Sequence, residues 1–231
     1  EKMRSNLLRA ISHDLRTPLT CILGSTATLR DNHQKLENDT RIRLLNDIYH
    51  DAEWLIQMVE NLLSVTKISG EGTQLKKQEE VVEEVVAESV SKIQKRFPTA
   101  EIRVRVPDEL LLLPMDAMLI EQVLINLMEN AIRHSDSQKP IYLTVKHLWH
   151  HVYFSVLDQG VGIEEERLPY IFDGTTSGKS SDSSRGLGIG LPICKSIITA
   201  HGGTIYAKNN ENGGANFTFV LPEEGVESYE Q

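Results

Sequence analysis

The hydrophobic residues of the N-terminal part of the chain repeat at intervals of three, four or seven, which is typical of one face of an α-helix. This spacing predicts a helix over residues 1–31 and a second over about 39–68, with a polar connection between them. Two long helices joined in this way form an antiparallel hairpin. A hairpin alone cannot cover both apolar stripes, so we expect two copies to form a four-helix bundle, which predicts a homodimer. The stripes are Leu7, Ile11, Leu15, Leu19, Ile22 and Leu29, then Ile42, Leu45, Ile48, Ala52, Leu55, Val59 and Leu62.

The pattern changes after a Gly-containing linker at 69–72, which divides the chain into a helical domain, 1–69, and a second domain, 70–231. The second domain alternates short strands with amphipathic helices, which predicts an α+β fold with helices on one face of a mixed sheet. Asp116 is a candidate N-cap for the central helix. The expected helices are 82–97, 116–134 and 188–201, and the expected strands are 102–106, 111–113 (ending before Pro114), 141–147, 152–158, 204–208 and 215–221.

Composition and charge argue against one class of partner, nucleic acid bound through bulk charge. The chain has 231 residues and a formal net charge of −9, which argues against nucleic acid as a partner. No apolar run reaches the roughly 18 residues of a membrane span, and no signal segment precedes the first helix. Because the chain begins at Glu1, we expect a fragment or processed product, with any membrane segment in a parent chain. Both cysteines, Cys21 and Cys194, lie in apolar patterns and are expected to be buried thiols.

The segment 12–19 places reactive groups inside the first helix. His13 falls off the apolar stripe and should face water, with Asp14 beside it and Thr17 one turn further along. Pro18 removes a helical N–H whose partner would be the Asp14 carbonyl, so we expect a weakened turn at this point. An exposed imidazole of this kind needs a reaction partner, so we look for a ligand-binding site elsewhere in the chain.

The helix over 116–134 carries polar side chains within an apolar run. Asn126 and Asn130 are four residues apart and share a face, and Arg133 and His134 follow on the next turn. A solvated helix face explains this pattern equally well. As a functional site, Asn carbonyls suit Mg²⁺ and Arg133 suits a phosphate group.

Two glycine-rich segments complete the candidate chemistry. Asp158, Gly160 and Gly162 follow a strand, where the carboxylate can accept from an exocyclic amine and the glycines admit a flat ring; an ordinary strand-end turn is the alternative. The run Gly186, Leu187, Gly188, Ile189, Gly190 and Leu191 opens a helix and favours an anion site. Its spacing does not fit a dinucleotide-binding fingerprint, and the segment 174–180 is one residue short of a P-loop.

Taken in order, these motifs closely resemble those of the sensor histidine kinases of two-component signalling. Residues 12–19 match the phosphoacceptor box of that family, 126–134 its N box, 158–162 its first glycine box and 186–191 its second; 213–217 resembles a third. The amino-acid sequences of residues 120–127 and 12–18 are most similar to those of the potassium-responsive Kdp-type sensor kinases. The resemblance implies that the second domain is an α/β sandwich of the histidine-kinase/Hsp90-type ATPase superfamily.

The resemblance also implies roles for individual residues. ATP would be bound with Asp158 against the adenine amino group, Mg²⁺ on Asn130 and Asn126, and phosphate near Arg133. His13 would be the phosphoacceptor, Asp14 its orienting base, and Thr17 would serve in dephosphorylating a response regulator. The implied partners are a second copy and a response regulator receiver domain, and the implied location is the cytoplasmic side of a bacterial plasma-membrane parent. The remaining ligand-binding positions would be His134, Gly160, Gly162, Gly186, Leu187, Gly188, Gly190 and Leu191.

One part of the family pattern is incomplete. The F box normally has two aromatics and a basic residue, whereas here Phe172 and Asp173 run directly into Gly174. Lys179 or Arg185 would then supply the missing positive charge. The gap leaves an alternative open, in which the chain is a weakly active or inactive dimeric scaffold that binds ATP or the regulator without turnover. A superfamily ATPase of the chaperone or mismatch-repair type is a further alternative, opposed by the helical hairpin that carries His13.

Overall fold

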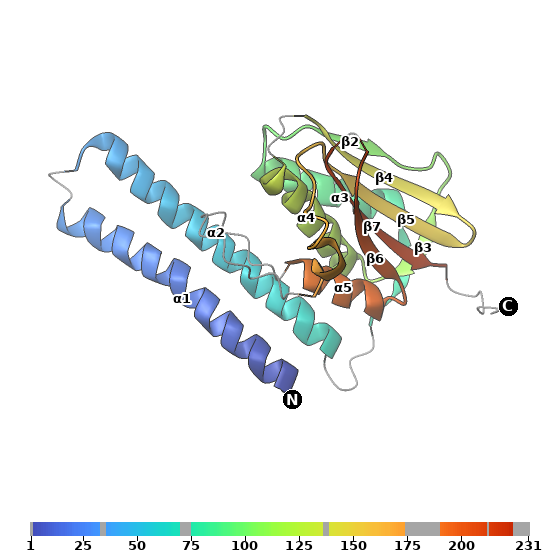
Figure 1. Ribbon diagram of the computed structural model, residues 1–231, viewed down its shortest axis with the longest axis horizontal. Helices are drawn as coiled ribbons and strands as arrows, with labels where there is room; N and C mark the ends of the chain where they lie inside the picture. Colours follow the sequence, from blue (N-terminus) through green and yellow to red (C-terminus); the bar gives the residue numbers. More distant parts are fainter. Residues whose placement is uncertain are drawn as a thin grey trace. The chain divides into compact units, whose positions relative to one another are not determined.

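The computed structural model describes residues 2–32, 36–69, 75–135, 139–173, 190–211 and 213–223. The chain forms two compact units, Glu1–Leu63 and Ser64–Gln231. The first contains helices α1 (Lys2–Asp31) and most of α2 (Asn38–Ser69), which run in opposite directions (Figure 1). The predicted helical hairpin is confirmed, with bounds within one or two residues of those expected. None of the helices in the described ranges combines the length and apolarity that crossing a bilayer requires.

The apolar stripes of the hairpin remain largely uncovered in a single chain. Among their described members, Leu19, Ile42, Leu45 and Val59 are 48–53% exposed, and Leu23 and Ile56, which lie outside the predicted stripes, are 70% and 61% exposed. The expectation of a buried Cys21 is wrong, because its side chain is exposed on this same hairpin. Two helices form a single layer, which leaves apolar side chains in water unless another layer covers them.

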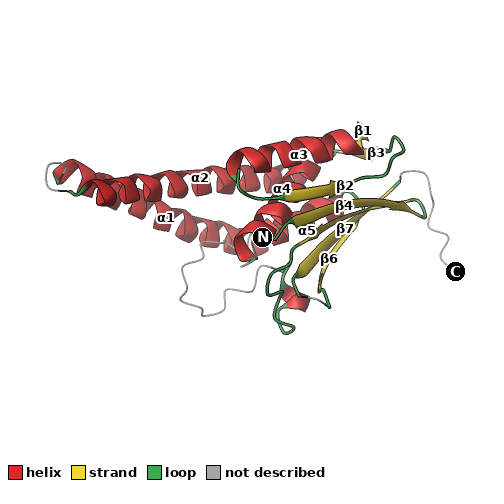
Figure 2. Ribbon diagram, turned by 90° about the horizontal axis from the view of Figure 1, so that it is seen from above, coloured by secondary structure: helices red, strands yellow, loops and turns green. Residues whose placement is uncertain are grey.

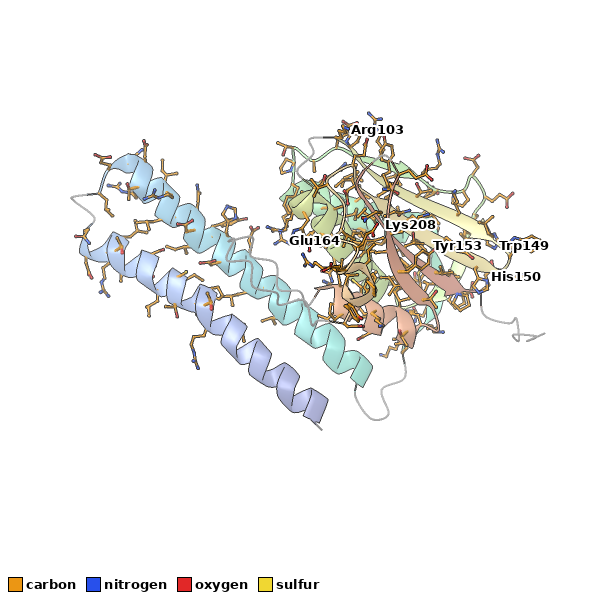
Figure 3. All side chains as sticks on the ribbon, in the orientation of Figure 1. Arg103, Trp149, His150, Tyr153, Glu164 and Lys208 are labelled. Carbon is orange, nitrogen blue, oxygen red and sulfur yellow. The ribbon has the colours of Figure 1, made fainter. Side chains whose placement is uncertain are left out.

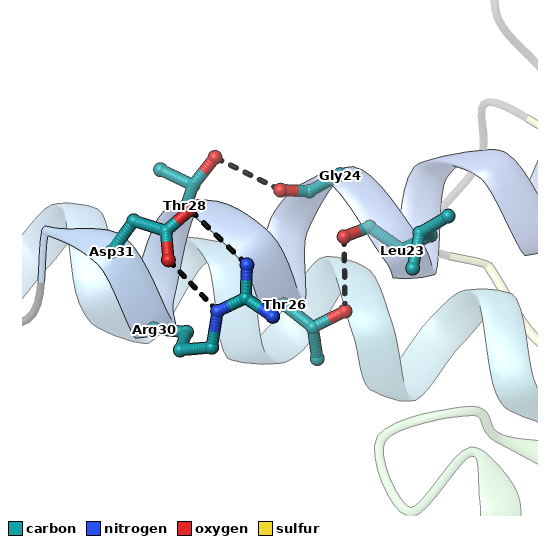
Figure 4. Close-up of polar contacts among 6 residues, drawn as sticks. All are labelled: Leu23, Gly24, Thr26, Thr28, Arg30 and Asp31. Atoms are coloured by element: carbon teal, nitrogen blue, oxygen red, sulfur yellow. Dashed lines mark hydrogen bonds and ion pairs between the residues drawn. The ribbon is translucent and has the colours of Figure 1, made fainter.

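The helix α1 continues through Pro18, whose side chain is buried. Beyond Pro18, threonine hydroxyls donate to carbonyls one turn back: Thr20 Oγ1 to Arg16 O at 2.7 Å and Thr28 Oγ1 to Gly24 O at 2.9 Å. Figure 4 shows the Thr26 and Thr28 hydroxyls in this arrangement, next to the Arg30–Asp31 ion pair at the helix end. Such back-bonding satisfies polar side chains within the helix without a partner from outside.

The second unit is built on a five-stranded sheet with the order β2-β4-β5-β7-β6. Strands β2 and β4 are parallel and the other neighbours are antiparallel, so the predicted mixed sheet is confirmed. Helices α3, α4 and α5 lie on one face, and within the described residues of this unit no α-helix covers the other face (Figure 2). The elements are β1 (Gln78–Val81), α3 (Val82–Arg96), β2 (Ile102–Arg105), β3 (Leu112–Met115), α4 (Ala117–His134), β4 (Ile141–Leu148), β5 (His151–Leu157), the 3₁₀ turn η1 (Leu168–Tyr170), α5 (Gly190–Ala200), β6 (Thr204–Asn209) and β7 (Ala215–Pro222).

Alternating side chains of the sheet form the core against the helices. Phe154 of β5 and Phe219 of β7 are fully buried and stack with ring centroids 4.5 Å apart. Val123, Leu127 and other apolar residues of α4 are also fully buried against this layer. Burial of this alternating set fixes the register, because a slip by one residue would turn the apolar residues outward.

Strands β3 and β1 differ from the sequence prediction. Strand β3 does not stop at Pro114 but includes it, paired with Glu79 of β1 in a separate two-stranded ladder. Proline is tolerated there because a two-stranded ladder leaves each strand one unpaired edge. Strand β1 was not expected from the sequence. The described part of α5 begins at Gly190, and the predicted start at 188 lies outside the described residues.

His201 connects the two helices that carry the polar motifs. It is 2% exposed, its Nδ1 lies 2.8 Å from Ile197 O, and the Asp116 N–H donates to its Nε2 at 3.1 Å. Asp116 is the predicted N-cap of α4, and its Oδ1 accepts from the Leu119 N–H at 3.2 Å. Burial lowers the pKa of His201, so the neutral imidazole holds the end of α5 to the start of α4.

Candidate functional site

Asp158 is the buried centre of the candidate site. It follows the last residue of β5, is 6% exposed, and donates its N–H to Ala215 O of β7 at 3.0 Å. Its Oδ1 accepts from the Gly160 N–H at 2.9 Å and from the Ala215 N–H at 3.2 Å. Among the described residues, both donors to this carboxylate use Oδ1, which leaves Oδ2 available to a ligand.

Glycines allow the backbone to close around Asp158. Gly214 has φ +87°, and a Cβ there would lie 2.1 Å from the Asp158 carbonyl oxygen. A Cβ on Gly160 would lie 2.8 Å from the Ser135 Cα, just beyond the end of α4. Gly214 requires glycine for both conformation and close approach, and Gly160 for close approach, so 213–214, the third glycine motif of the sequence, belongs to the same site as 158–162.

Asn209 fixes the far end of the Asp158 turn. Its Oδ1 accepts from the Ile163 N–H at 2.8 Å and its Nδ2 donates to Ile163 O at 2.6 Å. This pair of hydrogen bonds holds the turn at Gly162, which has φ +81°. Asn209 does not stand out in the sequence, because an Asn at the end of a strand is an ordinary turn residue.

The four polar residues of α4 do not share one environment. Asn126 is buried against α5: its Oδ1 accepts from Gln122 Nε2 at 3.4 Å, and a Cβ on Gly190 would lie 3.8 Å from its Cγ. Asn130 is half-buried, and within the described part of the chain no side-chain hydrogen bond is made by its amide. Arg133 is exposed, with its guanidinium carbon 5.3 Å from the centre of the Phe97 ring.

The C-terminal end of α4 lies beside the Asp158 turn. Desolvation and the positive charges of Arg133 and Arg167 lower the pKa of His134, while Asp158 acts in the opposite direction. Arg167, which precedes η1, was not singled out by the sequence analysis, because it stands alone among acidic neighbours in an unpatterned turn. The site therefore has a buried anion at Asp158 and exposed cationic groups beside it, a distribution that suits a ligand with an amine at one end and phosphates at the other.

The helix α5 begins at Gly190, next to Asn126 of α4. The buried thiol of Cys194 hydrogen-bonds the Asn126 side chain, and burial raises the pKa of this thiol to about 12. Leu191 is half-buried against the core. Lys179, Arg185, Gly186, Leu187 and Gly188 lie outside the described residues.

The F-box segment has a partner on α5. Phe172 is buried, with its ring 6.4 Å from the Phe217 ring in an edge-to-face arrangement. Asp173 Oδ1 lies 2.8 Å from Lys195 Nζ, so a basic residue does reach this segment, from α5.

The phosphoacceptor segment lies within α1. Residues 13 and 14 are helical, and their side chains lie outside the described set; Thr17 is described and exposed.

Two family models match the chain. One, described as His Kinase A (phospho-acceptor) domain, matches residues 3–71. The other, described as Histidine kinase-, DNA gyrase B-, and HSP90-like ATPase, matches residues 115–225. The two matches cover the hairpin and the site around Asp158 respectively.

The individual proteins similar to this chain include sensor kinases and solved histidine kinases. The Sensor protein KdpD of Clostridium acetobutylicum is 48% identical over 97% of this chain, and that of Escherichia coli K12 is 34% identical over all of it. The chain spans only 25% and 26% of the lengths of these two relatives. The solved catalytic domain of histidine kinase ThkA is 30% identical, with a TM-score of 0.57, over 64% of this chain and 97% of that domain. ThkA in complex with response regulator protein TrrA is 26% identical, with a TM-score of 0.69, over 94% of this chain and 61% of that one.

Proposed function

The chain belongs to the histidine kinases, and from this premise we propose that it binds Mg-ATP, phosphorylates its own His13 and transfers the phosphoryl group to an aspartate of a response regulator. The observation that carries the proposal is the Asp158 carboxylate, buried and fixed through Oδ1 by two backbone amides. A rigid acceptor at the end of a strand, walled by glycines, suits the exocyclic amine of adenine. We assign the hairpin 1–69 to phosphotransfer and 70–231 to nucleotide binding.

The residues around Asp158 form two subsites, one for the adenine ring and one for the phosphates. Asp158 Oδ2 accepts from the adenine amino group, and the turn at Gly160 and Gly162 lets the ring approach the backbone. Arg133 turns from the Phe97 ring towards phosphate, with His134 beside it. On the phosphate side, we assign the anion site to the segment that leads into α5, whose members are Gly186, Leu187, Gly188, Gly190 and Leu191; the first three lie outside the described residues.

Magnesium fits Asn130 better than Asn126. The Asn130 amide is half-buried at the site and has no hydrogen-bond partner among the described side chains, so its carbonyl oxygen is available as a hard ligand. Asn126 is engaged by Gln122 and Cys194, and it contributes by holding α5 against α4. The metal, when bound, neutralises phosphate charge during transfer.

His13 carries the phosphoryl transfer. A ring nitrogen of His13 attacks the γ-phosphorus of ATP, the bond from that phosphorus to the bridging oxygen breaks, and ADP leaves with the bond electrons. Asp14 orients the imidazole and accepts its proton. In the opposing phosphatase activity, Thr17 positions a water molecule to hydrolyse the phosphoaspartate of the regulator.

The partners follow from the same family membership. The exposed apolar side chains of the hairpin support a homodimer in which two copies form a four-helix bundle. The similar structure of ThkA with a response regulator supports a receiver domain as the phosphoryl acceptor. The Kdp-type relatives extend the proposal to a potassium-responsive sensor in which this chain is the cytoplasmic portion of a parent in the plasma membrane.

Labelling with γ-³²P-ATP and Mg²⁺ tests the autokinase directly. We expect acid-labile, base-stable label on the wild type, none on His13→Gln, and transfer to an added receiver domain. Label that persists on His13→Gln would refute His13 as the phosphoacceptor, whereas a wild type that binds ATP without becoming labelled would favour the inactive scaffold. Thr17→Ala should keep the autokinase activity and slow the loss of label from the regulator.

A further inference from the structure

The face of the five-stranded sheet opposite α3, α4 and α5, which no described helix of its own unit covers, carries an unusual set of side chains. The strand register places Arg103 and Lys208 at the two ends of one cross-strand row, and Arg105 and Tyr206 at the ends of the next. Lys146 pairs with Tyr153 in a third row. We call this surface the open face; Figure 3 labels Arg103, Tyr153 and Lys208 on it. No position in these three described rows is Asp or Glu.

The absence of carboxylates from these rows contrasts with the rest of the unit. The chain has 33 acidic against 24 basic residues, and acidic side chains gather on other surfaces, such as Glu83 and Glu84 in the first turn of α3. Arg103 pairs with Glu101 at the edge, with Nε 2.8 Å from Oε1. Both side chains are 57% exposed, so water screens this pair and the guanidinium stays accessible. The open face is therefore locally positive on an acidic protein.

The tip of the β4–β5 hairpin adds an exposed aromatic next to the open face. Trp149 is 90% exposed and Leu148 is 48% exposed. Trp149 and His150 both have positive φ, 51° and 61°, in a two-residue turn where Asn and Gly are the usual residues. His147 and His150 brace the turn through the two oxygens of Glu223, at 2.8 and 3.2 Å. A braced, strained turn thus holds a large apolar ring in water.

We propose that the open face and Trp149 dock the catalytic unit onto an anionic membrane surface. Separate cations spread over a sheet suit a fluid layer of headgroup phosphates, which can move to meet them. Tryptophan and tyrosine favour the level of the headgroups, where one end of the ring system is apolar and the other is wet. A folded acidic protein fits less well, because the centre of the open face holds the half-buried Ser155, whose hydroxyl hydrogen-bonds that of the buried Thr218 at 2.9 Å, rather than the apolar core of a protein interface.

Vesicle cosedimentation tests the proposal with the whole chain. We expect binding to vesicles of phosphatidylglycerol and phosphatidylcholine, weakened by salt, and none to phosphatidylcholine alone. Lys146→Gln with Lys208→Gln removes two cations from the open face and should weaken binding about thirtyfold. The matched control, Lys76→Gln with Lys95→Gln, removes the same charge from exposed positions before β1 and on α3 and should leave binding unchanged.

Tryptophan fluorescence gives a second readout. The chain has two tryptophans, Trp54 and Trp149, so Trp54→Phe leaves Trp149 as the sole reporter. Its emission should shift to the blue with anionic vesicles. The proposal is overturned if both lysine double variants lose vesicle binding equally, or if Trp149 emission does not shift to the blue. If the chain is retained on polyglutamate and does not bind vesicles, the open face would instead bind an acidic protein. His13 phosphorylation, measured in parallel, separates this result from the fate of the proposed kinase activity.

Discussion

Two substitutions at Asp158 separate its structural role from its ligand-binding role. In Asp158→Asn the amide oxygen still accepts from the Gly160 and Ala215 N–H groups, so the turn keeps both hydrogen bonds. The amide nitrogen replaces Oδ2 and places a donor against the adenine amino group. Losing a charged acceptor and opposing two donors costs about 3 kcal/mol, roughly a hundredfold in Kd.

Asp158→Ala removes the acceptor as well. The Ala215 N–H is buried and would lose its partner, while the half-buried Gly160 N–H can turn to water. We expect the free energy of unfolding to fall by about 2–3 kcal/mol in Asp158→Ala and by less than about 1 kcal/mol in Asp158→Asn.

Urea denaturation and calorimetric titration with ATP measure the two effects separately. The expected pattern is a stable Asp158→Asn variant with weak ATP binding and an Asp158→Ala variant defective in both. An Asp158→Asn variant that binds ATP like the wild type would refute the assignment of Oδ2 to adenine. Equal destabilisation of both variants would instead refute the role given to Oδ1.

Three further predictions follow from the same structure. Gly214→Ala places a Cβ 2.1 Å from the Asp158 carbonyl oxygen at φ +87°, so the free energy of unfolding measured in urea should fall by about 2–4 kcal/mol. Gly24→Ala has open space around its Cβ and should raise this free energy by about 0.5–1 kcal/mol. Similar effects at both sites would contradict the steric argument. Burial lowers the pKa of His201 in the folded state, so the unfolded state takes up the proton at a higher pH. The free energy of unfolding should therefore fall as the pH drops below about 6.5, by up to about 1.4 kcal/mol per pH unit. If His201→Gln shows the same pH dependence of stability as the wild type, His201 is not the group responsible. The double variant Lys179→Ala and Arg185→Ala should slow autophosphorylation about tenfold or more in a single-turnover assay, and unchanged rate and ATP affinity would show that neither residue replaces the F-box cation.

The parts of the fold with a strong local pattern were predictable from the sequence. The helix α3 shows a 3.6-residue apolar period and ends before Pro98, and α4 has the Asp116 cap, so both were placed within a residue or two. Strand β1 has only one apolar residue, Val81, and is a strand because it pairs with β3. Such a strand depends on a partner distant in sequence, which local periodicity does not report.

The same limit applies within the candidate site. Asp158, Gly160 and Gly162 stand out because chain neighbours form a motif, whereas Asn209 acts through Ile163, which lies 46 residues away along the chain. Burial was equally hard to assign for the helix motif: Asn126 and Asn130 share a face by spacing, yet Asn126 is buried under α5 and Asn130 is half-buried. Packing of α5 on α4, a tertiary contact, decides the difference.

The connections between α4 and α5 bear on what the incomplete F box can change. His201 joins the end of α5 to Asp116, and Cys194 joins its first turns to Asn126, so the helix is tied to α4 along its length. Asp158 is fixed by β7 and its own turn, and both described donors to its carboxylate lie outside the F-box segment. The proposed adenine side of the site therefore does not depend on the described part of the F box. A missing cation there acts on the phosphate side, where charge develops during transfer, so it should lower the rate of phosphorylation and leave the affinity for ATP nearly unchanged.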